Sequence, residues 1–229
     1  GTTATLKLDS SGSASYMSIA AQQGAVATVT TANGGTFNTF SAAEIPSGTA
    51  LTYAVSKDGT TNLIVSSGYD YQGFGTWATG INTGSGNAGA SSVGNITPAS
   101  SLPATGTATF TGFTIATVAL SSSTAAPDTM IAGMTSKVDF GARTVAFQTA
   151  GSSVMGQTGN TSNPNLNLSG LFTYNAGSSQ FSGAVANGSG SLKGSGTGQF
   201  YGPNAQEIGG TYYLSGSGGV MFGGFGGKR

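Results

Sequence analysis

Few side chains in this sequence could carry chemistry. There are 7 Asp and Glu and 7 Lys and Arg, and there is no His or Cys. Without His the chain lacks the commonest general base and metal ligand, and without Cys it lacks disulfides, thiolate ligands and thiol nucleophiles. What remains is carboxylate catalysis, which needs two acids about 5 to 9 Å apart. The acids are Asp9, Glu44, Asp58, Asp70, Asp128, Asp139 and Glu207.

No two of these acids form a motif that implies such a pair. Most stand beside turn residues, as in KDG at 57–59 and APD at 126–128. The sequence therefore predicts a protein that is not an enzyme, although fold alone never excludes chemistry.

The stretch GQFYGPNAQEIGGTYYL at 198–214 combines a carboxylate with glycines, a proline and aromatic residues. It could be a phosphate-binding loop, a catalytic acid in an aromatic pocket, or a turn between strands. No helix follows to supply the amide cluster that binds phosphate. Pro203 and Asn204 suit a hairpin turn. We therefore expect a turn, in which Glu207 bonds turn amides or pairs with a cation.

Composition removes other classes of function. The net charge is +0 and the sequence has no basic cluster, which argues against nucleic acid as a partner. No apolar run approaches the roughly 18 residues that a membrane-spanning helix needs. The N-terminus does not resemble a signal peptide, so we expect a processed chain.

The elements that must position these residues are strands, because polar and apolar residues alternate almost everywhere. In SLKGSGTGQFY (191–201), glycines share one face with Leu192 and Phe200. Such a face suits a tightly curled sheet, as inside a small barrel. The opposite faces are rich in Thr, Ser, Lys and Gln, which predicts a soluble barrel. Eight strands are expected at 104–119, 130–140, 143–150, 164–174, 179–187, 190–200, 206–215 and 218–227.

The expected fold class is all-β, with a C-terminal eight-stranded antiparallel barrel at 104–229. Residues 1–81 read as a small N-terminal β-sheet subdomain, and the Gly/Ser/Pro-rich stretch 82–103 reads as a connecting loop. The alternative is that the N-terminal strands continue one large sheet. Phenylalanines are expected to fill the barrel: Phe110, Phe140, Phe172, Phe181, Phe200 and Phe222.

Several motifs in order resemble the transferrin-binding protein B superfamily. The last strands of that family resemble GQFYGPNAQEIGGTYYL and the terminal GGVMFGGFGGKR. Its first barrel strand resembles LPATGTATFTG (102–112), and its Asp-Phe hairpin resembles SKVDFGARTVAF (136–147). Its middle strands resemble LFTYNAGSSQFSGAV (171–185). YDYQGFGTWATG (69–80) resembles the end of the sheet that precedes the barrel and is called the handle.

The resemblance implies a binding protein of the Gram-negative cell surface, lipid-anchored at the outer membrane, or a secreted haemophilin-like relative. Relatives capture transferrin, haemoglobin, haem or complement factor H, often for a TonB-dependent outer-membrane receptor. Many carry an N-terminal lipidated Cys, which this sequence lacks. A single handle-plus-barrel unit favours a smaller ligand or another partner than transferrin. The alternative is a structural or adhesive surface protein without a nutrient ligand.

Haem would have to be ligated by Tyr or Met, because His and Cys are absent. Tyrosines at period two usually lie on sheet faces and methionines usually fill gaps, so each candidate also has a structural interpretation. The candidates are Tyr16, Met17, Tyr69, Tyr71, Met130 and Met134.

Aromatic residues in the stretch 69–77 are a second candidate site, because Tyr, Trp and Phe dominate binding hot spots. The alternative is that they pack between handle and barrel. Further contacts are expected in the segments 82–103 and 121–129. The aromatic candidates are Tyr69, Tyr71, Phe74 and Trp77.

Overall fold

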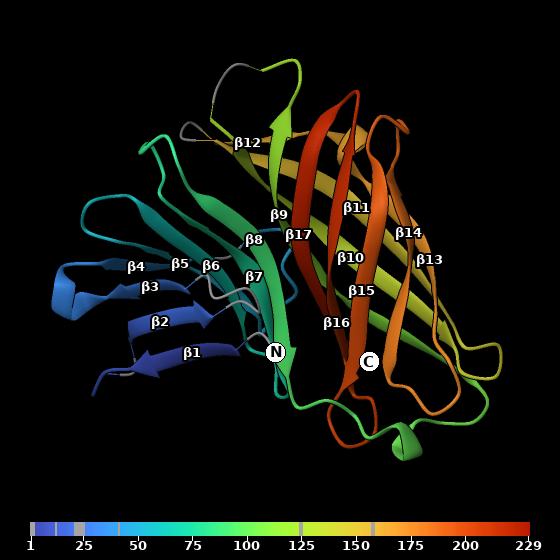
Figure 1. Ribbon diagram of the computed structural model, residues 1–229. Coiled ribbons are helices and arrows are strands. Elements are labelled where there is room, and N and C mark those ends of the chain that lie inside the picture. The colour runs from blue at the N-terminus through green and yellow to red at the C-terminus, as the bar shows by residue number, and fades with distance from the viewer. Residues whose placement is uncertain (1–2, 12, 21–25, 41, 124–125, 157–158) are drawn as a thin grey trace.

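The computed structural model describes residues 3–11, 13–20, 26–40, 42–123, 126–156 and 159–229. These residues form three antiparallel sheets (Figure 1). The helical elements among them are short 3-10 turns: η1 (Thr31–Asn33), η2 (Ala99–Ser101) and η3 (Pro164–Leu166). None of the described helices has the length and hydropathy to cross a membrane. The predicted all-β fold class is confirmed.

The C-terminal part of the chain is a closed barrel of antiparallel strands that follow one another around the ring. The last strand pairs with the first and closes the ring. A short additional strand, β12 (Gly159–Ser162), extends from the end of one barrel strand. The ring consists of β9 (Thr107–Leu120), β10 (Asp128–Asp139), β11 (Thr144–Gly156), β13 (Leu168–Thr173), β14 (Gln180–Asn187), β15 (Lys193–Tyr201), β16 (Glu207–Gly216) and β17 (Gly219–Lys228).

These eight strands coincide with the eight predicted ones to within a few residues at most ends. Of the alternating glycines of β15, Gly196 and Gly198 are buried against core rings, on the same face as Leu192 and Phe200. A Cβ on Gly198 would collide with the ring of Phe181. The glycines therefore leave room for rings that reach across the barrel.

The barrel core is a set of stacked and tilted phenylalanines. Five of the six predicted core phenylalanines are buried there, but Phe222 is not. Phe222 lies on the outer face, opposite Tyr213, and its neighbour Met221 points inward. Four rings of the core were not predicted, namely Phe147, Tyr174, Tyr212 and Phe225.

The N-terminal part forms two sheets stacked beside the barrel (Figure 1). The handle sheet has five strands in sequence order, and the outer sheet has three. The handle sheet consists of β4 (Thr36–Phe40), β5 (Ala50–Val55), β6 (Thr61–Ser67), β7 (Gln72–Thr79) and β8 (Asn87–Gly94). The outer sheet consists of β1 (Thr3–Leu8), β2 (Ala14–Ala20) and β3 (Val26–Thr30).

The handle sheet is sandwiched because successive side chains of its strands point to opposite faces. On one face, Phe74 joins Phe113 and Ile115 of the barrel in a buried cluster. On the other face, Trp77 packs against Met17 of the outer sheet. Strand β7 carries apolar residues on both faces because one face packs against the barrel and the other against the outer sheet.

The segment 82–103, expected to be a connecting loop, contains β8 at its centre and η2 near its end. Strand β8 pairs with β7 along its whole length, from Asn87 to Gly94. Its sequence, NAGASSVG, is poor in the β-branched and aromatic residues that mark strands. Pairing with β7 overrides that weak propensity. Proximity to the barrel also favours small side chains there.

Candidate functional site

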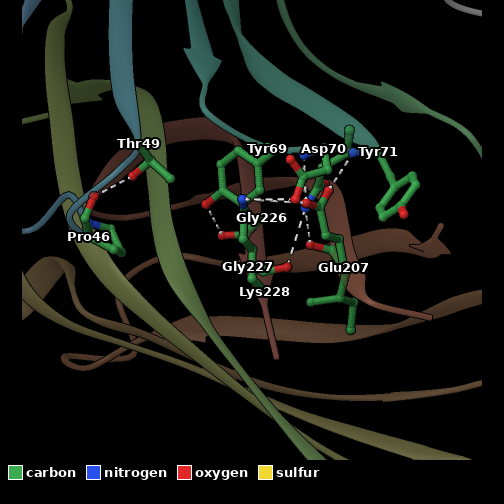
Figure 2. Close-up of polar contacts among 11 residues, drawn as sticks. Pro46, Thr49, Tyr69, Asp70, Tyr71, Glu207, Gly226, Gly227 and Lys228 are labelled. Atoms are coloured by element: carbon green, nitrogen blue, oxygen red, sulfur yellow. Dashed lines mark hydrogen bonds and ion pairs between the residues drawn. The ribbon is translucent and has the colours of Figure 1, made fainter. Parts of the chain in front are cut away.

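Glu207 connects the barrel to the handle sheet. It is the first residue of β16, and its side chain is only 1% exposed. Its carboxylate accepts hydrogen bonds from the backbone N–H of Asp70 at 2.8 Å and of Tyr71 at 3.1 Å (Figure 2). Both amides belong to the turn that leads from β6 into β7. The carboxylate of the motif therefore acts as an acceptor for a distant turn.

Lys228 supplies the positive charge at this junction. Its Nζ lies 3.3 Å from an Asp70 carboxylate oxygen and 3.9 Å from Glu207 Oε1. It also lies 5.6 Å from the centre of the Tyr69 ring. The predicted role of Glu207, binding turn amides or pairing with a cation, is confirmed in both parts. The amides, however, come from the handle and not from its own turn.

Two further side chains of the handle bond the backbone of the last barrel strands. The Tyr69 hydroxyl donates to the carbonyl of Gly226 at 3.0 Å (Figure 2). The Gln72 side-chain amide donates to the carbonyl of Ile208 at 2.7 Å. A Cβ on Gly226 would collide with the ring of Phe74. The glycine of this barrel strand therefore lets the handle approach closely.

The turn before Glu207 differs in detail from the expectation. Left-handed backbone falls on Gly202, at φ 83°, and on Ala205, at φ 55°. Asn204, expected to suit this turn because asparagine tolerates positive φ, is not one of the positive-φ residues. Ala205 is fully buried, so packing against the barrel core holds it in this strained region.

A groove runs between β8 and the outer face of the barrel, and the sequence did not indicate it. Two adjoining cavities of about 330 and 410 Å³ share Ala90, Thr197 and Thr211 in their lining. Ser92 of β8 and Tyr201 of β15 share a hydrogen bond of 2.9 Å between their hydroxyls. The residues lining both cavities include no charged side chain. This groove is the candidate binding surface.

Comparison with known proteins identifies the barrel. The family model described as the C-lobe and N-lobe beta barrels of Tf-binding protein B matches residues 102–229. The chain belongs to the transferrin-binding protein B family. A comparison with curated proteins gives no match.

Solved structures of this family share the fold. A mutant of transferrin binding protein B from Haemophilus parasuis Hp5 has 14% identity and a TM-score of 0.54, with 93% of this chain and 50% of that chain covered. Intact Ap-TbpB, with its N and C lobes, has 14% identity and a TM-score of 0.53, with 99% of this chain and 52% of that chain covered. This chain thus spans about half the length of these relatives.

In this family member both carboxylates at the junction have bonding partners. The Glu207 carboxylate is buried and bound to two amides, and the Asp70 carboxylate is paired with Lys228. The described residues contain no cluster of three acidic residues that could hold a metal ion. The arrangement fastens the handle to the barrel.

Burial changes the chemistry of the tyrosines at the junction and in the core. It raises the pKa of Tyr69 above its ordinary value, and the negative charge of Glu207 adds to this effect. Burial likewise raises the pKa of Tyr212, whose hydroxyl lies 2.9 Å from that of Thr114. Both hydroxyls therefore stay protonated in the folded protein at pH values where an exposed tyrosine ionises.

The protein is accordingly expected to lose stability in alkali. Because the folded-state pKa is raised, the contribution of each tyrosine is complete below its ordinary pKa of 10.0 and is lost as the pH rises above it. Urea unfolding between about pH 8 and 11 measures this loss. The Tyr69→Phe variant should show a smaller decline above about pH 10 than the wild type. An identical decline would contradict the role of Tyr69.

The aromatic candidates of the stretch 69–77 do not form one exposed patch. Phe74 is 1% exposed and packs on the barrel, and Trp77 is 7% exposed on the opposite face of the handle sheet. Tyr69 packs edge-on against Phe74. Tyr71 is half-buried beside Gly202. Tyr69 and Phe74 therefore pack between the handle and the barrel, as the alternative interpretation expected.

The six candidate haem ligands are dispersed as well. Met130 and Met134 are buried in the barrel core, whereas Met17 is buried between the handle and outer sheets. Tyr16 lies under Lys7, whose Nζ is 5.0 Å from the centre of its ring. The three methionines could therefore reach haem only with displacement of core side chains, whereas Tyr16, Tyr69 and Tyr71 are half-buried. The segment 121–129 is described only at 121–123 and 126–129, and its remaining residues lie outside the described part of the chain.

Proposed function

We propose that this chain is a non-enzymatic binding protein, exposed on the surface of a Gram-negative bacterium or secreted from it. It captures a host or environmental protein, such as an iron carrier, for a TonB-dependent outer-membrane receptor. The observation that carries the proposal is the groove between the barrel and β8, which is built on a barrel of the transferrin-binding protein B family. The solved relatives are described as transferrin binding proteins.

A protein partner is favoured over haem for two reasons. The Tyr and Met residues that could ligate haem iron are spread over different elements, and the three methionines among them are buried. The groove has an uncharged lining and lies along β-strands of two sheets, which suits contact with a polypeptide. Capture of a nutrient that is not a protein is the alternative form of this proposal.

A structural or adhesive surface protein is the second candidate. The composition suits it equally well, with 6% charged residues and 40 glycines. A TonB-dependent receptor encoded beside this protein would favour capture over adhesion. So would release of the partner to that receptor.

The groove is expected to carry partner binding. The variant Thr197→Arg places a large charged side chain on the groove floor, so affinity should fall by about tenfold or more, or about 1.4 kcal/mol. The matched control is Thr173→Arg, an exposed threonine of β13 outside the groove. Immobilised wild type first captures partners from serum, and calorimetry then compares the variants. Equal affinity of Thr197→Arg and wild type would place the partner elsewhere, and capture of no protein would contradict the proposed function.

A further inference from the structure

Strand β8 is a free edge of the handle sheet. Among the described residues it pairs with β7, and the strand order ends there. The eight-stranded ring of the barrel, in contrast, has no edge because its last strand pairs with its first. Proteins usually protect an exposed edge with Lys, Pro or a bulge. The β8 sequence NAGASSVG has no charge and no proline, and its pairing with β7 shows no register shift.

The phase of the β7–β8 pairing shows which backbone groups of β8 point away from β7. The Asn95 amide donates to the Tyr71 carbonyl at 2.8 Å, so this pair bonds directly and so does every second pair beyond it. On the far side of β7 the Phe74 amide donates to Ser66 Oγ, which agrees with this alternation. The β8 residues that turn their N–H and C=O groups outward are Ala88, Ala90, Ser92 and, at the closed end of the groove, Gly94.

The groove lies directly beside this row of groups. Its floor is the cross-strand pair Thr197 and Thr211, whose hydroxyl side chains face outward from the barrel. Toward the Ala88 end, the floor becomes apolar and aromatic, with Tyr213 and Phe222. Tyr213 is 55% exposed, so its ring is available to an occupant.

At the Gly94 end of the groove, the chain that follows β8 pairs with the barrel through backbone hydrogen bonds. Beyond β8, Ile96 forms an isolated antiparallel bridge with Tyr201 at the end of β15. The Thr97 amide donates to the Phe200 carbonyl at 2.9 Å. From this closed end β8 continues along the barrel with its edge free. The groove is therefore bounded at one end and open along the edge.

We propose that an extended, uncharged segment of the captured protein adds to β8 as a further strand of the handle sheet. The segment exchanges backbone hydrogen bonds with Ala88, Ala90 and Ser92, while alternate side chains point to the groove floor. Charged side chains are excluded from those alternate positions because the uncharged lining offers them no partner. This inference rests on the proposed function, for which it supplies the mode of recognition.

A second copy of this chain is a poorer occupant of the groove. In each copy the Ser92 hydroxyl is bonded to Tyr201 of its own barrel. Two β8 edges could meet only with both barrels brought against each other. An extended segment that has no barrel beside it can enter the groove directly.

The test uses a phage library of random peptides of about ten residues, long enough to pair along β8. The full chain selects peptides, which are then measured against two variants. Ala90→Pro removes one outward N–H and leaves the bonds to β7 intact, so the sheet should tolerate it. Ala90→Ser keeps that N–H and is the matched control. Enriched peptides should bind Ala90→Pro at least about tenfold more weakly than the wild type, and Ala90→Ser within about twofold.

Methylation of single backbone nitrogens in a selected peptide tests the same contact without a change in the protein. Binding should fall at every second residue, because alternate amides of an added strand face β8. A loss without this period, equal binding to Ala90→Pro and wild type, or no enrichment of peptides would overturn the inference. The inference would also be overturned if the chain formed a dimer and Ala90→Pro abolished that dimer, because a second copy would then be the occupant. Failure of peptide selection with serum capture intact would leave the proposed function standing.

Discussion

Replacement of Phe147 by alanine is expected to lower the free energy of unfolding by about 3 to 5 kcal/mol. Phe147 is fully buried in the barrel core. Its ring centre lies 4.8 Å from that of Phe225 and 5.6 Å from that of Phe172. Truncation removes these contacts and leaves a cavity, because the closed ring of strands cannot collapse around it. Urea unfolding followed by circular dichroism measures the change.

The matched control is Leu171→Ala on β13. Leu171 is 59% exposed on the outer face of the barrel, so its truncation should change the free energy of unfolding by less than about 0.5 kcal/mol. Comparable losses for both variants would mean that the barrel interior is not the main source of stability. An unchanged unfolding midpoint for Phe147→Ala would contradict the packing described for the core.

The barrel could be predicted because its strands are separated by clear turn signals and their side chains alternate. The prediction failed at Phe222, where the glycines of GVMFGGFGGK hide the alternation. Phe222 and Phe225 are three residues apart and cannot both point inward in a regular strand. The sequence does not say which of the two does so. The structure buries Phe225 with Met221 and leaves Phe222 in the groove.

The groove and the junction were beyond sequence reasoning for a different physical reason. The bond between Glu207 and the Asp70 amide joins residues 137 positions apart, and no local pattern encodes such a contact. Strand β8 is built of small residues that look like a linker, and it is held by its pairing with β7. The aromatic stretch 69–77 looked like a binding patch because exposed and buried aromatics cannot be told apart by spacing alone.

Replacement of Glu207 by alanine is expected to cost about 2 to 5 kcal/mol of the free energy of unfolding. The variant leaves the amides of Asp70 and Tyr71 without their acceptor at a junction where Glu207 itself is 1% exposed. Each unsatisfied buried donor costs about 1 to 3 kcal/mol. Thermal and urea unfolding measure the loss. Glu207→Gln should cost less, because one side-chain oxygen can still accept an amide hydrogen bond.

The loss of stability in Glu207→Ala should appear first where the handle meets the barrel. In Glu207→Ala, hydrogen exchange at the Asp70 and Tyr71 amides should accelerate, while amides of the barrel strands far from the junction keep their protection. Asp70→Asn is the matched control, since its side chain is 73% exposed and its pair with Lys228 contributes at most about 1 kcal/mol. If Asp70→Asn cost as much as Glu207→Ala, the ion pair and not the buried carboxylate would fasten the handle. If exchange accelerated evenly over the whole chain, handle and barrel would unfold as one unit.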